Sequence, residues 1–170
     1  METTRNPLTP EQSSFFRSLR NFLDTPIYFF GSIQRLDYIP GYSDIDVLVF
    51  TDNFSEMKYK LTSFLQKQAG DYKRIVKHIG DQVFVGYKIF YKNLEKSIIA
   101  EVTVFASKDK DLYLKIQREV KDSVPLGIML VMYIVKLLFY RLEIISHSTY
   151  RDIKAALLNQ KSGKEFVSID

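Results

Sequence analysis

Residues 28–50 read YFFGSIQRLDYIPGYSDIDVLVF, and this stretch decides the expected fold. Two short apolar runs, Ile27 to Phe30 and Ile45 to Phe50, have the length and composition of β-strands. The first run ends in Gly31-Ser32, and the second begins with Asp44-Ile45-Asp46. A plain core strand needs neither pattern, so the stretch predicts a binding site held between two strands.

Asp44 and Asp46 predict a cation site at the start of the second strand. Side chains two residues apart on a strand point to the same face, so the two carboxylates lie side by side. Ionised carboxylates at that range repel each other unless a cation lies between them. An all-oxygen ligand set favours a hard ion such as Mg²⁺, or Mn²⁺ in its place. The pair therefore indicates metal-assisted phosphoryl chemistry.

Gly31 and Ser32 predict a phosphate pocket that faces the metal pocket. Glycine at the end of a strand allows another group to approach the backbone closely. We expect Ser32 to cap a short helix, which leaves free N–H groups pointing at an anion such as a triphosphate. The structural alternative is a hairpin-like turn that ends in a solvated acidic strand.

The stretch resembles the signature of the polymerase-β-like nucleotidyltransferase superfamily. That signature is an apolar residue, Gly-Ser, a spacer of about ten residues, and Asp-apolar-Asp leading a strand; here the spacer is about eleven. Phe30-Gly31-Ser32, Tyr38-Ile39-Pro40-Gly41 and Ser43-Asp44-Ile45-Asp46 resemble the poly(A) polymerase, terminal uridylyltransferase and oligoadenylate synthetase branch. Residues 43–49 also resemble the minimal bacterial nucleotidyltransferases, so the branch stays open.

The resemblance implies an α+β fold and a transferase. We expect a small mixed sheet of about five strands backed by helices, with a catalytic core over residues 1–106 and a helical segment over residues 107–170 packed on it. The implied reaction transfers a nucleoside monophosphate from a nucleoside triphosphate to an acceptor hydroxyl, with an RNA 3′ end as one candidate, and releases pyrophosphate. The alternatives are an inactive nucleotide-binding or regulatory relative and an antitoxin-type enzyme that modifies another protein.

Glu101 is the expected third acidic residue of the site. It lies among apolar neighbours in the predicted strand Ser97 to Phe105, where an unpaired charge would be costly. The resemblance implies that it binds two divalent ions together with Asp44 and Asp46, although related enzymes usually carry Asp at this place. The alternative is an exposed Glu101 beside Thr103, paired with a lysine.

The resemblance also implies nucleotide-binding roles outside the acidic set, for Gly31, Ser32, Ser43, Lys136 and Tyr150. Lys136 lies on a long apolar helix, and related enzymes carry a lysine on a comparable helix that contacts the triphosphate. The alternative is a lysine that snorkels to solvent from a mostly buried helix.

The apolar periodicity predicts the remaining elements. We expect helices over 10–23, 54–68, 109–122 and 126–145, and strands over 72–79, 83–91 and 97–105. Thr9 as cap, Pro10 at the first position and Gln12 reaching back indicate the start of the first helix. The last two strands should form an antiparallel hairpin, and the helix over 126–145 should be a central core helix rather than a membrane span.

The amino-acid composition indicates where the protein is located and what kind of partner it binds. The chain has 170 residues, no cysteine and a formal net charge of +4, which fits one globular domain with an anionic partner and excludes a disulfide framework. The polar N-terminus lacks an apolar signal core, so we expect an intracellular, cytoplasmic protein without a membrane anchor. Members of the branch continue beyond this length, so we expect the usual RNA platform to be missing or to be supplied by a partner subunit or in a homo-oligomer.

Overall fold

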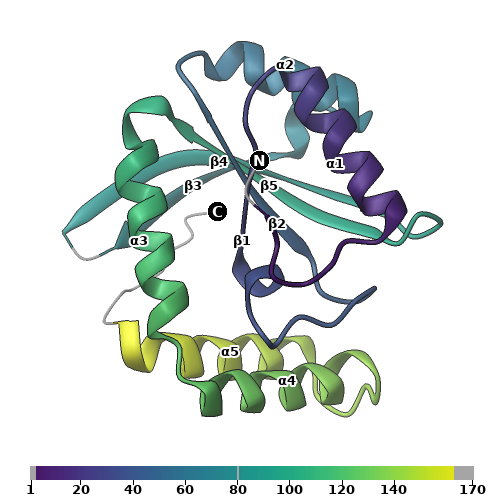
Figure 1. Ribbon diagram of the computed structural model, residues 1–170, viewed down its shortest axis with the longest axis vertical. Coiled ribbons are helices and arrows are strands. Elements are labelled where there is room, and N and C mark those ends of the chain that lie inside the picture. Colours follow the sequence, from purple (N-terminus) through teal and green to yellow (C-terminus); the bar gives the residue numbers. More distant parts are fainter. Residues whose placement is uncertain (1–2, 80, 163–170) are drawn as a thin grey trace.

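The computed structural model describes residues 3–79 and 81–162 (Figure 1). Residues 1–2 of the expected catalytic core and residues 163–170 of the expected helical segment lie outside this part of the chain. The described elements are, in order, α1 Pro10–Leu23, β1 Tyr28–Phe30, η1 Gly31–Gln34, β2 Ile45–Thr51, α2 Phe54–Leu65, η2 Ala69–Asp71, β3 Tyr72–Ile79, β4 Gln82–Asn93, β5 Ile98–Ala106, η3 Ser107–Asp109, α3 Lys110–Ser123, α4 Leu126–Tyr140 and α5 His147–Ser162. The expected α+β class is confirmed.

The five strands form one mixed sheet in the order β1-β2-β5-β4-β3. β2 and β5 run parallel to each other, and every other neighbouring pair is antiparallel. The expected antiparallel hairpin of the last two strands is therefore confirmed. The parallel pair lies inside the sheet, and β2 is apolar on both faces over most of its length, as a strand covered on both sides requires.

Helices cover both faces of the sheet (Figure 1). One core joins α1 and α2 to the sheet through residues such as Phe16, Leu61, Val47 and Val102. The second core lies on the other face under α3, where Tyr113 packs with side chains of β2, β4 and β5. Alternate residues of β2 and β5 therefore point into different cores, which fixes the face to which each polar residue of these strands points.

The local signals at helix ends explain where α1 begins and α2 stops. The Thr9 hydroxyl accepts from the backbone N–H of Gln12 at 3.2 Å, and the side-chain Oε1 of Gln12 accepts from the backbone N–H of Thr9 at 3.1 Å, so the expected start is confirmed. The expected end of the second helix near residue 68 is wrong. Gln66 adopts a left-handed conformation with φ 52°, which ends α2 at Leu65.

The helix expected over 126–145 is shorter and more exposed than predicted. It ends at Tyr140, where the N–H groups of Arg141 and Leu142 both bond to the Leu137 carbonyl and close the last turn. Within α4, which is described throughout, only Met132, Val135 and Lys136 are buried. The expected central core helix is thus wrong: α4 pairs with α5 along one edge of the molecule (Figure 1). None of the described helices is long and apolar enough to cross a membrane.

Candidate active site

Three carboxylates lie together on the α3 face of the sheet. Asp46 of β2 and Glu101 of β5 are direct partners in the parallel register. Their neighbours Val47 and Val102 point into the α1–α2 core, so both carboxylates point to the opposite face. Asp44 lies two residues before Asp46 and close enough to act on its charge. The structure therefore brings the three predicted acidic residues together.

The three carboxylates repel each other strongly. Burial, together with the charges of Asp44 and Glu101, raises the pKa of Asp46 to about 7. Two lysines, Lys77 of β3 and Lys154 of α5, oppose this shift without cancelling it. A bound cation would favour the ionised form of Asp46, so the arrangement fits a cation better than it fits a purely structural role.

Glu101 has a protein partner in this structure. Its Oε2 lies 3.2 Å from Nζ of Lys88 on β4, which agrees with the lysine pairing of the alternative interpretation. That interpretation also expected an exposed sheet face around Glu101 and Thr103. This is wrong for Thr103, whose side chain is fully buried. Among the described residues, no group of three or more His, Cys, Asp or Glu side chains is already spaced to hold an ion. Ligation by all three carboxylates therefore requires these side chains to move from their present positions.

Gly31 forms the wall against which Asp46 packs. Its φ is +70°, which side chains of L-residues rarely allow, and a Cβ built on Gly31 would overlap the Oδ2 atom of Asp46. The backbone at the end of β1 therefore lies directly against the carboxylate. Gly31 therefore allows a close approach to the backbone, here by Asp46, and the approach of a phosphate stays a prediction.

We expect Gly31→Ala to lower the free energy of unfolding by about 1–3 kcal/mol, because Asp46 must move away from the new methyl group. For the same reason we expect it to slow the nucleotidyl transfer implied by the sequence about a hundredfold. Gly41→Ala is the matched control. Gly41 also has a positive φ, at +81°, but nothing lies within 4 Å of its Cβ position, so it reports the backbone strain alone. Chemical denaturation and initial rates compare the two variants; equal effects would contradict the packing of Asp46 against Gly31.

Ser32, the residue after Gly31, carries a free hydroxyl. The expectation that Ser32 caps the following helix is wrong, because the N-cap of η1 is Phe30, which makes no side-chain capping bond, and Ser32 lies inside the turn. The hydroxyl is buried and has no hydrogen-bond partner. A buried hydroxyl without a partner is costly, so Ser32 is available to a ligand.

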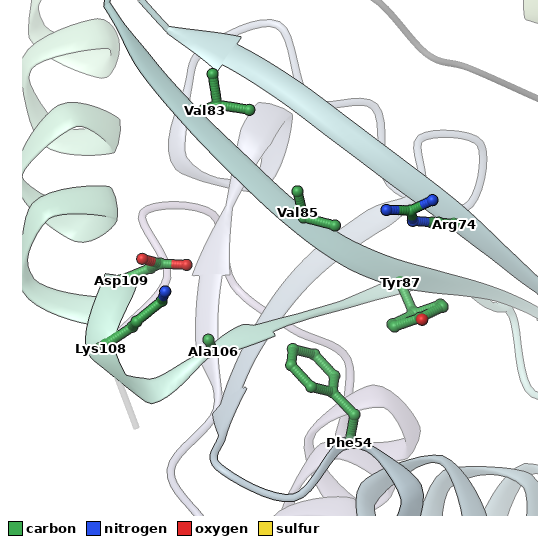
Figure 2. Close-up of a pocket in the computed structure, with 8 residues that line it drawn as sticks. All are labelled: Phe54, Arg74, Val83, Val85, Tyr87, Ala106, Lys108 and Asp109. Atoms are coloured by element: carbon green, nitrogen blue, oxygen red, sulfur yellow. The ribbon is translucent and has the colours of Figure 1, made fainter.

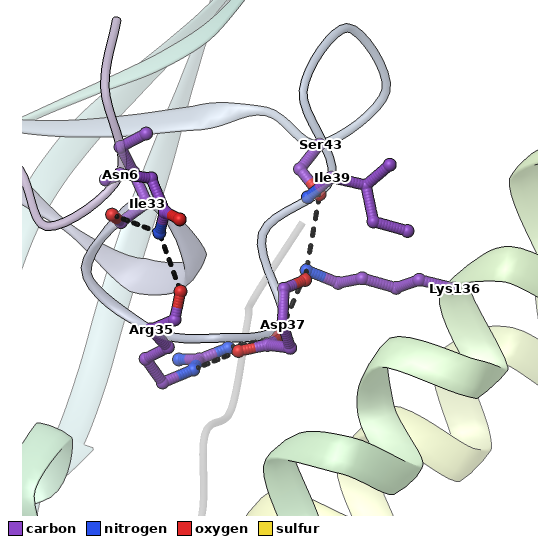
Figure 3. A network of polar contacts seen from close by, with 7 residues as sticks. All are labelled: Asn6, Ile33, Arg35, Asp37, Ile39, Ser43 and Lys136. Atoms are coloured by element: carbon purple, nitrogen blue, oxygen red, sulfur yellow. Dashed lines mark hydrogen bonds and ion pairs between the residues drawn. The ribbon is translucent and has the colours of Figure 1, made fainter.

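A buried polar network ties α4 to the connection between β1 and β2 (Figure 3). Nζ of Lys136 donates to the Asp37 carbonyl at 2.8 Å and to Oγ of Ser43 at 3.3 Å, and lies 3.1 Å from Oδ2 of Asp37. Arg35 holds the same carboxylate from the other side, with its Nε 2.7 Å from Oδ1. Lys136 is only 3% exposed, so the snorkelling alternative is wrong.

The network fixes the residues that lead into the acidic strand. Burial alone would raise the pKa of Asp37, but Arg35 and Lys136 outweigh burial and lower it. Burial lowers the pKa of Lys136, and Asp37 opposes that shift. Ser43, which directly precedes Asp44, accepts from the Ile39 N–H at 3.1 Å as well as from Lys136. The network therefore orders the approach to the carboxylates.

Tyr150 of α5 lies near this network. Its ring stacks on Phe139 with centroids 4.4 Å apart and an interplanar angle of 5°. Burial raises its pKa, and Tyr140, with which it shares a hydrogen bond, and Asp44 raise it further. Tyr150 is thus within electrostatic range of the acidic residues. Nucleotide contacts of Ser43, Lys136 and Tyr150 stay predictions.

Comparison with known families decides what kind of protein carries this site. Residues 11–145 match the nucleotidyltransferase domain family, and this range includes the strands, the carboxylates, α3 and α4. The chain belongs to the nucleotidyltransferase domain family. The resemblance to the polymerase-β-like superfamily is thereby confirmed, whereas its branch stays a prediction. A search of curated proteins finds no match.

The sequence did not reveal five charged residues of this nucleotidyltransferase site. They are Arg35, Asp37, Lys77, Lys88 and Lys154. Arg35 and Asp37 gave a weak signal, as opposite charges in a spacer that is otherwise rich in apolar and turn residues. The three lysines gave none, because their nearness to the carboxylates depends on strand pairing and helix packing.

The nucleotidyltransferase also has a concavity of about 450 Å³ away from the carboxylates (Figure 2). Its lining residues are Phe54, Arg74, Val83, Val85, Tyr87, Ala106, Lys108 and Asp109. Tyr87 pairs with Val104, whose side chain points into the α1–α2 core, so the strand residues of this concavity are on the other face of the sheet. It is therefore separate from the candidate active site.

Proposed function

We propose that this nucleotidyltransferase transfers a nucleoside monophosphate from a nucleoside triphosphate to an acceptor hydroxyl and releases pyrophosphate. The observation that carries the proposal is the pairing of Asp46 with Glu101 across the parallel strands, beside Asp44 and against the backbone of Gly31. Family membership supports nucleotidyl transfer in general and a nucleoside triphosphate as substrate. The catalytic core over residues 1–106 and the helical segment over residues 107–170 remain part of the proposal.

Asp44, Asp46 and Glu101 would hold Mg²⁺ or Mn²⁺ in this proposal. The donor set fits such ions, because it consists of oxygen atoms only and its members repel each other until a cation is present. When bound, a divalent ion supplies charge neutralisation at the phosphates and activation of the acceptor hydroxyl. Lys88 would release Glu101 when this ligand set assembles.

The residues of the chain itself would bind and orient the triphosphate. The backbone at Gly31 allows the phosphates to approach, and the free hydroxyl of Ser32 can donate to a phosphate oxygen. Lys77 and Lys154, whose charges already act on Asp46, are suitable cations for the phosphate chain. The Arg35–Asp37–Lys136 network would keep the β1–β2 connection in place during the reaction.

For the acceptor we propose an RNA 3′ end, an anionic partner with which the mildly basic composition is compatible. A partner subunit or a second copy of the chain is also part of the proposal. The cysteine-free composition is compatible with the cytoplasm as the proposed location.

Labelled nucleotides test the proposal. The chain is incubated with each α-labelled nucleoside triphosphate, Mg²⁺ or Mn²⁺, and separate pools of RNA and of proteins. We expect label on RNA that depends on the divalent ion, and no transfer from γ-labelled nucleotide. Label on protein would instead indicate the antitoxin-type activity. Nucleotide binding without any transfer would indicate the inactive relative.

We expect Glu101→Gln to lower turnover about a hundredfold while the Kd for nucleoside triphosphate changes less than about threefold. In related enzymes the third carboxylate serves mainly the activation of the attacking hydroxyl. Lys88→Gln is the control, because it also breaks the Lys88–Glu101 pair but keeps the carboxylate. Nucleotide titration and initial rates separate binding from turnover; an equal loss of both in Glu101→Gln would contradict this role.

A further inference from the structure

The outer side of α4 is an exposed apolar surface. Leu126 is 68% exposed, Leu130 is 60% exposed and Ile134 is 48% exposed. Val131 and Tyr133 are also exposed beside them, and we call these five residues the α4 face. They follow helical spacing, so they lie on one side of the helix, away from the buried Met132, Val135 and Lys136. Monomers rarely expose a continuous apolar surface of this kind.

The α4 face carries no charge with which to select a charged partner. The only charged residue between Leu126 and Tyr140 is Lys136, and its ammonium group is engaged with Asp37 on the buried side of the helix. The net charge of +4 therefore arises elsewhere in the chain. A surface without charges does not repel a second copy of itself, so the charge pattern is compatible with self-association.

The α4 face also has a shape that can pair with itself. Leu126, Leu130 and Ile134 are spaced by four residues and form a ridge of large side chains. Beside this ridge, Gly127 and Val131 form a shallow groove, and nothing lies within 4 Å of the Cβ position of Gly127. In an antiparallel pair related by a two-fold axis, the ridge of each helix enters the groove of the other.

We propose that the α4 face is the interface of a homodimer. The α4–α5 pairs of two chains form an antiparallel four-helix bundle, in which the face is buried from water. The exposed parts of the α4 face add up to several hundred Å², a large share of the roughly 800 Å² per partner of a standard interface. The face lies opposite the side of α4 that contacts Asp37 and Ser43, so the dimer leaves both active sites open.

The mass of the chain in solution tests the proposal without reference to catalysis. Light scattering at micromolar concentration is expected to give twice the chain mass of 19.9 kDa. Leu130→Glu is expected to weaken self-association by roughly a hundredfold, since it buries a carboxylate against its symmetry mate. Leu94→Glu, at a leucine that is 69% exposed between β4 and β5, should leave the dimer intact. Thermal melts monitored by circular dichroism confirm that both variants fold.

Cysteine cross-linking places the interface. The chain has no cysteine, so a single introduced thiol can form a disulfide only between two chains. We expect at least one of Leu130→Cys, Val131→Cys and Ile134→Cys to give a covalent dimer under mild oxidation, and Leu94→Cys to give none. Single-chain mass for the wild type at all concentrations, cross-linking no faster than in Leu94→Cys, or occupation of the face by another protein or by lipid vesicles would each overturn the homodimer.

Discussion

Asp46→Asn is expected to slow nucleotidyl transfer by about a thousandfold or more, equivalent to about 4 kcal/mol of transition-state stabilisation. Asp46 is the central carboxylate of the site, between Asp44 and Glu101 and against Gly31. Its amide replacement keeps the shape of the side chain but removes the charge that would hold a cation. Initial rates at saturating nucleotide and Mg²⁺ measure the loss.

The same substitution should stabilise the fold in metal-free buffer above neutral pH. The pKa of Asp46 is about 7 in the folded chain and 3.8 in the unfolded reference. The folded state therefore binds more protons between these values, and stability is lost as the pH rises from about 4 to 7. Asp46→Asn removes this loss, and we expect a gain of roughly 1–3 kcal/mol at pH 8.

Asp52→Asn is the matched control, because Asp52 is an exposed acid just beyond the end of β2. It should leave the rate of nucleotidyl transfer unchanged and should not stabilise the fold in metal-free buffer. If Asp46→Asn unfolds markedly in metal-free buffer, the carboxylates serve the structure and the site assignment is wrong.

Lys136→Met is expected to lower the free energy of unfolding by about 2–4 kcal/mol. The substitution leaves Asp37 buried with Arg35 as its remaining cation and removes the link between α4 and Ser43. Urea denaturation measures the change. Lys60→Met is the control, because its partner Glu56 forms a surface ion pair on α2 at 2.7 Å, worth about 0–1 kcal/mol.

Nucleotide titration of Lys136→Met then separates two roles. If Lys136 reaches the triphosphate during binding, affinity for a triphosphate falls more than affinity for a nucleoside, by about 1.5–3 kcal/mol. If Lys136 only positions the β1–β2 connection, both affinities change together. A variant with wild-type stability would contradict the buried network.

Local chemistry explains what the sequence could predict. The start of α1 follows from Thr9 and Gln12, β3 follows from its aromatic and β-branched residues, and the nearness of Asp44 and Asp46 follows from strand periodicity. Each of these depends on residues within a few positions of each other. The prediction that Glu101 joins Asp44 and Asp46 depended instead on the family resemblance of the Gly-Ser and Asp-x-Asp pattern. In the structure, the parallel register of β2 and β5 places Glu101 opposite Asp46.

The errors have a different physical origin. The apolar length of α4 predicted a core helix, but apolar composition does not say what covers a segment, and here only three residues of this fully described helix are buried. The partners of Lys136 could not be predicted either, because Asp37 and Ser43 lie 99 and 93 residues away in the chain. Lys88 meets Glu101 only through the antiparallel register of β4 with β5.

The long link between Lys136 and Asp37 has a consequence for the order of events during synthesis. The sheet is complete once β5 has left the ribosome, but the β1–β2 connection gains its α4 partner only 99 residues after Asp37. Contacts of such large sequence separation form late because they close long loops. A nascent chain halted after α3 would therefore hold a formed sheet with a loose β1–β2 connection, which proteases should cut near Asp37 until α4 emerges.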